Sequence, residues 1–134
     1  MGYTVLEEEF SNKEVRDSLI ELIESVVEDL EEFYDSLERG EVDVVEWINE
    51  NTYSVFDCYK GKLAVCFAYG GPGLWINENG EGIAKDWGAN YIEFRVTGKA
   101  WEAIREIFLT LEEIYTDFTI ASARAKCESV WMRK

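Results

Sequence analysis

Hydrophobic residues recur every three or four positions through the first third of the chain, which is the period of one face of an α-helix. This stripe occupies Val15–Leu37. Ser11 and Glu14 have the spacing of a capping box before it, and Gly40 is typical of the position after a helix end. The pattern therefore predicts one long helix over residues 12–38.

A shorter helix is expected over Val44–Asn49, and the pattern then changes to short runs rich in β-branched and aromatic residues. Turn residues, glycine above all, separate these runs, as is typical of an antiparallel sheet. Lys60-Gly61-Lys62 is the predicted first hairpin turn. The predicted strands are Tyr53–Tyr59, Leu63–Tyr69, Leu74–Ile76, Gly82–Trp87 and Tyr91–Val96.

A helical period returns after Thr97, which we expect to cap a last strong helix. The tail from Phe118 to Lys134 is ambiguous, with a weakly helical second half. We predict a single α+β domain with a long N-terminal acidic helix, an antiparallel sheet of about four to five strands and a C-terminal helix packed on that sheet. Its expected parts are residues 1–50, 51–97 and 98–134.

Charge is distributed unevenly along the 134 residues. The chain has 28 acidic and 13 basic residues, and its net charge is −15. Residues 1–50 hold 17 of the acids and three of the bases. Such a surface repels nucleic acid and attracts a basic groove, so we expect a basic nucleic-acid-binding protein as partner, with no direct nucleic-acid contact.

The composition limits the class of protein and the compartment in which it is expected. The chain is 47% hydrophobic, which excludes a disordered acidic tail, and no apolar run is long enough to span a membrane. The N-terminus lacks the pattern of a signal peptide, and three cysteines is an odd number. We therefore expect a cytoplasmic protein with reduced thiols. Cys58 and Cys66 are predicted to be buried and unpaired in strands.

Enzymatic motifs are missing from the sequence. It contains no histidine, no phosphate-binding loop and no C-x-x-C pair. We expect no enzyme, no cofactor and no metal site. A small hydrolase or nuclease that uses clustered carboxylates and Mg²⁺ is a weaker alternative, because no spacing points to such a site.

The side of the predicted long helix opposite its apolar stripe is densely acidic. On one long helix, these carboxylates make a localised field comparable to a single row of DNA phosphates, although sparser. The acidic residues expected to contact a partner, here called the acidic face, are Glu21, Glu24, Glu28, Glu31, Glu32 and Asp35. A solvated helix face with no partner is the alternative interpretation.

One segment carries a resemblance. The run Phe67–Asn77, which contains G-G-P-x-x-W-I and is followed by Asp86-Trp87-Gly88, resembles small acidic proteins carried by phages and plasmids of Firmicutes and related bacteria. The resemblance covers about residues 53–116. Proteins of this size, charge and setting are similar in type to anti-CRISPR and anti-restriction proteins, many of which mimic DNA. The resemblance implies a setting, the cytoplasm of a bacterial host cell, and transfers no catalytic residue. The analogy with anti-CRISPR and anti-restriction proteins implies a non-enzymatic inhibitor of a defence complex.

A structural or regulatory interaction module is the second hypothesis. If the apolar stripe exceeds what the sheet covers, the excess has to be buried against another copy of the chain. The expected seam of such a homodimer consists of Leu19, Ile23, Val26, Leu30 and Phe33.

Overall fold

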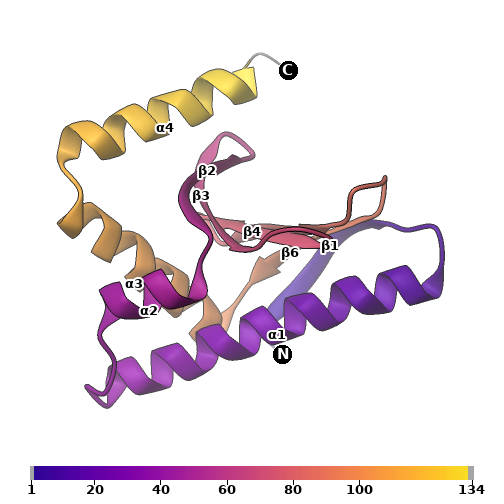
Figure 1. Ribbon diagram of the computed structural model, residues 1–134, viewed down its shortest axis with the longest axis horizontal. Coiled ribbons are helices and arrows are strands. Elements are labelled where there is room, and N and C mark those ends of the chain that lie inside the picture. The colour runs from indigo at the N-terminus through magenta and orange to yellow at the C-terminus, as the bar shows by residue number, and fades with distance from the viewer. Residues whose placement is uncertain (1, 133–134) are drawn as a thin grey trace.

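The computed structural model describes residues 2–132 and has an α+β fold, as predicted (Figure 1). The strands are β1 (Tyr3–Glu9), β2 (Ser54–Tyr59), β3 (Lys62–Ala68), β4 (Gly73–Asn77), β5 (Glu81–Lys85) and β6 (Tyr91–Val96). The helices are α1 (Lys13–Glu38), α2 (Val44–Asn51), α3 (Gly98–Ile114) and α4 (Asp117–Met132). None of these helices is both long and apolar enough to cross a membrane.

The six strands form one antiparallel sheet in the order β1-β6-β5-β4-β3-β2. Strands β2 to β6 follow one another as a meander, and β1 joins the far edge beside β6. The sequence predicted the meander but missed β1, so the expected four to five strands become six. In the segment before α1, three consecutive glutamates obscure the alternation of Tyr3 and Val5 with exposed neighbours.

The first hairpin turn has two residues, because Tyr59 lies directly opposite Lys62. Lys60 and Gly61 both have positive φ, 52° and 75°. Positive φ at both central residues is the requirement of a type I′ turn, whose twist matches that of the strands. The three-residue turn expected from the sequence is therefore one residue too long.

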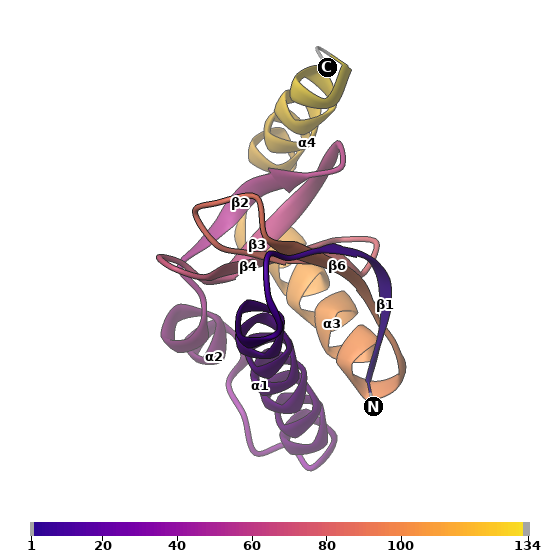
Figure 2. The same ribbon diagram turned by 90° about the vertical axis from the view of Figure 1, so that its right-hand side faces the viewer.

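The core lies between one face of the sheet and the helices. Figure 2 shows α1 and α3 side by side beneath the sheet. Helix α1 packs against α3, β5 and β6, and buried residues of both helices belong to the same hydrophobic cluster as those of the sheet. The buried residues of α1 are Leu19, Ile23, Val26, Val27, Leu30 and Phe33. The apolar stripe predicted from the sequence is thus confirmed as the core side of this helix.

Both ends of α1 have recognisable caps. At the N-terminus the Asn12 side chain accepts the Val15 N–H at 3.0 Å, so the cap is Asn12 and the predicted Ser11 box is wrong. At the C-terminus Gly40 has a φ of 69°. Its N–H donates to the Leu37 carbonyl, and the next N–H donates to the Ser36 carbonyl. This is a Schellman motif, which confirms the predicted glycine position.

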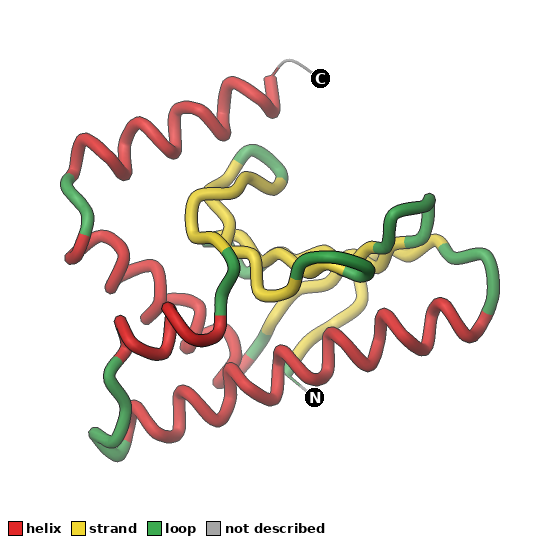
Figure 3. The backbone as a smooth tube through the Cα atoms, viewed as in Figure 1, coloured by secondary structure: helices red, strands yellow, loops and turns green. Residues whose placement is uncertain are grey.

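The ambiguous tail forms helix α4 as far as Met132, and residues 133–134 lie outside the described residues. This helix lies at the end of the molecule away from α1 (Figure 3). A disulfide joins Cys127 of α4 to Cys58 of β2, across 69 residues of sequence. The expectation of reduced, unpaired thiols is therefore wrong for these two cysteines. It is right for Cys66, which is buried and free.

Candidate interaction surface on helix α1

The acidic face follows the long axis of α1 on the side that points away from the core. None of its six carboxylate residues is buried, whereas the six buried residues on the opposite side are at most 8% exposed. The helix period that places the stripe inside therefore places these acids outside. The structure divides them into two sets of three, according to their contacts.

The inner set faces neighbouring elements of the same chain. Glu24 accepts a hydrogen bond from the Tyr3 hydroxyl of β1 at 3.2 Å. Asp35 forms a 2.8 Å salt bridge with Lys99 of α3. Glu31 lies beside Gly2, close enough that a Cβ on that glycine would be 2.8 Å from its carboxylate. These three acids therefore take part in the contacts that attach α1 to β1 and α3.

The pKa values at this inner edge agree with these contacts. Burial, and then the charge of Glu24, raise the pKa of Tyr3. The hydrogen bond and charge of Asp35, with a smaller effect of Glu31, raise the pKa of Lys99. Lys99 thus stays protonated at any physiological pH and neutralises part of the inner set.

The outer set consists of Glu21, Glu28 and Glu32, which are exposed. Within residues 2–132 none of them forms a hydrogen bond or a salt bridge. Glu14 is exposed on the same side and is equally without a partner there. We call Glu14, Glu21, Glu28 and Glu32 the acidic row. At 1.5 Å per residue, the row extends over about 27 Å of helix.

The basic residues of α1 and of its C-terminal cap form salt bridges with acidic residues outside the row. Lys13 binds Asp17 at 2.8 Å, Arg16 binds Glu8 at 3.1 Å, and Arg39 binds Glu41 at 3.1 Å. Asp29 is a neighbour of the row. Burial, and then repulsion from the charge of Glu28, raise the pKa of the Asp29 carboxyl. The row is therefore a run of uncompensated negative charge.

Acidic side chains of α3 lie beside the C-terminal part of α1, a neighbourhood that the sequence analysis missed. A hydrogen bond to Glu38 is the main cause that raises the pKa of Tyr34 to about 12. Burial follows, and the charges of Glu38, Glu102 and Glu106 add to it. Only the packing of α3 against α1 brings the last two residues to this place.

The remaining chemistry of the described chain is sparse. No group of three or more Asp, Glu, Cys or His side chains in residues 2–132 is arranged to hold a metal ion. Burial, and then the charge of Asp57, raise the pKa of the Cys66 thiol to about 11. That thiol is protonated at neutral pH and is a poor nucleophile.

The apolar stripe is not available as a homodimer seam. The five residues of the predicted seam are between 0% and 8% exposed within one chain, because β5, β6, α2 and α3 cover them. A dimer through this stripe would require the monomer to open. The predicted seam is therefore wrong.

Comparison with protein-family models, with curated proteins and with solved structures found no match to this chain. The resemblance around the G-G-P-x-x-W-I segment therefore stays a prediction that depends on those residues alone. What the surface can do has to be argued from its charge and geometry.

Proposed function

We propose that this protein is a non-enzymatic inhibitor of a bacterial nucleic-acid-targeting defence complex, of the anti-CRISPR type, and acts in the cytoplasm of the host cell. Its acidic row occupies the basic channel in which the complex holds DNA or RNA. The observation that carries this proposal is the row itself: four exposed carboxylates on one rigid helix, with no cation bound to them in the described chain.

The spacing of the row suits a groove lined with Lys and Arg. Glu14, Glu21 and Glu28 are seven residues apart, so each lies about 10 Å further along the helix than the last. Glu32 follows after one turn. The row is sparser than a DNA strand, but its backbone is already ordered as a helix, so the conformational entropy lost when a partner binds is that of the side chains alone.

Electrostatics also favours fast association. A chain of net charge −15 creates a long-range field that steers it toward a positive channel. Because the row is exposed to solvent, its attraction should weaken as salt rises. The mechanism is competition for the channel, and no bond of the nucleic acid is made or broken.

The proposal is tested with two charge-matched variants. One is Glu21→Gln/Glu28→Gln/Glu32→Gln, which neutralises most of the row. The control is Glu50→Gln/Glu113→Gln/Glu128→Gln, which neutralises three exposed acids on α2, α3 and α4 that form no salt bridge in the described chain. DNA cleavage by a panel of guide-loaded CRISPR effectors and restriction enzymes is measured at low and moderate salt.

We expect the wild-type protein and the control variant to inhibit one member of the panel, and the row variant to lose that inhibition while its circular dichroism is unchanged. A folded row variant that inhibits as well as wild type would overturn the proposal. Inhibition of no member would leave a solvated acidic helix and favour the interaction module, through a surface other than the buried stripe.

A further inference from the structure

Four aromatic side chains from different segments of the chain gather at the glycine-rich bend Gly70–Gly73, between β3 and β4. Tyr53, Tyr69 and Trp87 are 70%, 60% and 75% exposed, and Trp75 lies partly buried behind them. Tyr69 is at the centre, with its ring centroid 6.3 Å from Tyr53, 6.5 Å from Trp75 and 6.0 Å from Trp87. We call these four residues the aromatic surface.

This surface contributes little to the core. Its three outer rings remain mostly in water, although large aromatic rings gain most from burial. Tyr69 meets both tryptophans edge to face, at interplanar angles of 83° and 88°. Exposed Tyr and Trp in contact with one another are typical of the residues that dominate the energy of protein interfaces.

Two contacts within the chain show which kind of ligand the Trp75 ring favours. The Lys85 ammonium lies 5.3 Å from the centroid of the Trp75 ring, as in a cation–π contact. The Trp75 indole N–H donates to the Asp57 carboxylate at 2.8 Å. A carboxylate at the N–H makes the ring face more negative, so this arrangement favours a cation on the ring.

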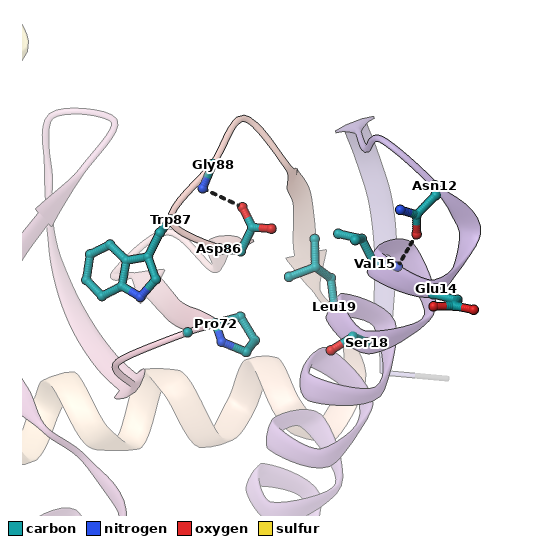
Figure 4. A pocket seen from close by; sticks show the side chains of 10 residues that line it. Asn12, Glu14, Val15, Ser18, Leu19, Pro72, Asp86, Trp87 and Gly88 are labelled. Carbon is teal, nitrogen blue, oxygen red and sulfur yellow. Dashed lines mark hydrogen bonds between the residues drawn. The ribbon is translucent and has the colours of Figure 1, made fainter.

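A cleft of about 500 Å³ adjoins Trp87, between the first turns of α1 and two loops, Gly71-Pro72 and Asp86–Gly88 (Figure 4). Val15 and Leu19 line its α1 side, and Figure 4 shows the Asp86 carboxylate pointing into it from the loop. Glu14, the first member of the acidic row, also lines it. No Lys or Arg is among its lining residues in the described chain.

The loop side of the cleft is fixed and negatively charged. Asp86 accepts hydrogen bonds from the Gly88 N–H and from the Asn90 side chain, both at 2.8 Å. The bond from Asn90 is the main cause that lowers the pKa of Asp86. The carboxylate is therefore ionised at neutral pH and held in one orientation.

We propose that the aromatic surface and the adjoining cleft bind arginine side chains of the basic partner, an inference that rests on the proposed function. An arginine has an apolar stem that suits Val15, and a planar guanidinium that stacks on aromatic rings and pairs with carboxylates. Glu14 belongs to both the cleft and the acidic row, so one partner surface can contact the two sites together.

Single-stranded nucleic acid is the other class of molecule that stacks on exposed aromatic rings. Here its phosphates would meet the carboxylates of Glu14 and Asp86, on a chain of net charge −15. The charge therefore favours arginine, and the nucleic acid becomes an outcome of the test.

The experiment is an NMR titration of the ¹⁵N-labelled full chain with the peptide acetyl-Gly-Arg-Gly-Arg-Gly-amide. The same peptide with citrulline in place of arginine is the uncharged control, and a thymidine oligonucleotide tests the other class. The indole N–H signals of Trp75 and Trp87 and the amide of Gly88 report on the proposed site. The indole signals of Trp47 and Trp101, which pack against the core, are internal references.

We expect the arginine peptide to shift the reporting signals and the citrulline peptide to leave them unchanged. Trp87→Ala should weaken the binding about fivefold, which is the size of one cation–π contact. Phe118→Ala, which removes an aromatic ring that is 82% exposed elsewhere, should leave it unchanged. Both ring variants are checked for unchanged amide spectra away from the substituted residue.

The outcomes separate this inference from the proposed function. If the arginine peptide shifts only α1 amides around the acidic row, the aromatic site is wrong and the proposed function stands. If the indoles shift equally in wild type and in the row variant, the aromatic site stands even where the row variant keeps its inhibition. Shifts of the indoles by the oligonucleotide, or equally by the citrulline peptide, would overturn the arginine site.

Discussion

Helices α1 and α4 lie at opposite ends of the molecule and are held there in different ways. Six apolar residues of α1 are buried against the sheet and the other helices, whereas α4 buries only Ile120 and Cys127 among residues 117–129. Helix α4 is attached instead by the Cys58–Cys127 disulfide and by Arg124, which binds Glu78 and Glu112. Packing on its inner side is therefore enough to hold α1 in place, and its outer side is free to carry charge.

The largest effect should come from removing the covalent attachment of α4. The disulfide closes a loop with a sequence separation of 69, so Cys58→Ser/Cys127→Ser should lower the free energy of unfolding by about 4 kcal/mol. Urea unfolding measures this loss. Hydrogen exchange should show lost protection in α4 and kept protection in α1; equal protection of α4 in both forms would mean that packing alone holds it.

The apolar anchor of α1 should give the next largest effect. Leu30 is 0% exposed, so Leu30→Ala should lower the free energy of unfolding by about 3 kcal/mol. Urea unfolding at two protein concentrations is the measurement. A small loss that depended on protein concentration would show that the stripe is shared between two copies, contrary to its burial within one chain.

The acidic row should matter little to the fold. Glu21→Gln/Glu28→Gln/Glu32→Gln should change the free energy of unfolding by less than about 0.5 kcal/mol, because these side chains have no partner in the described chain to lose. Asp35→Asn is the sharper comparison, since it breaks the salt bridge to Lys99. A row variant less stable than Asp35→Asn would assign the row a structural role.

The smallest effect concerns pH. Burial and Glu28 raise the pKa of Asp29 in the folded chain, so its ionised form costs stability above that pKa, and the cost disappears as pH falls through it. Asp29→Asn should therefore raise stability by less than about 0.5 kcal/mol at neutral pH and by nothing at acidic pH. Thermal unfolding at the two pH values measures the difference; a gain that persisted in acid would exclude charge as its cause.

The sequence predicted α1 and the meander because their periods are regular over many residues. It missed β1, whose apolar alternation is interrupted by three glutamates, and it left α4 open, because Phe118 is exposed where a buried stripe would be expected. The disulfide could not be predicted either, because the pairing of Cys127 with Cys58 depends on where α4 lies.

The sequence predicted the position of the acidic face but not its contacts. Helical spacing alone places the six acids on one side of α1, and the structure agrees. Spacing cannot show which of them face other parts of the chain, because Tyr3 and Lys99 reach Glu24 and Asp35 only through the packing of β1 and α3. Helical spacing also places Glu14 on this side, but the sequence analysis assigned it to a capping box with Ser11, which the structure replaces with the Asn12 cap.

The most direct measurement of the central claim is competition between the protein and nucleic acid for one partner. Immobilised wild-type protein and its Glu21→Gln/Glu28→Gln/Glu32→Gln variant are exposed to guide-loaded CRISPR effectors and restriction complexes, and any retained complex is challenged with its own target DNA. The proposal predicts retention by the wild-type protein alone and release by the DNA. Equal retention by both proteins, with no release by DNA, would contradict it.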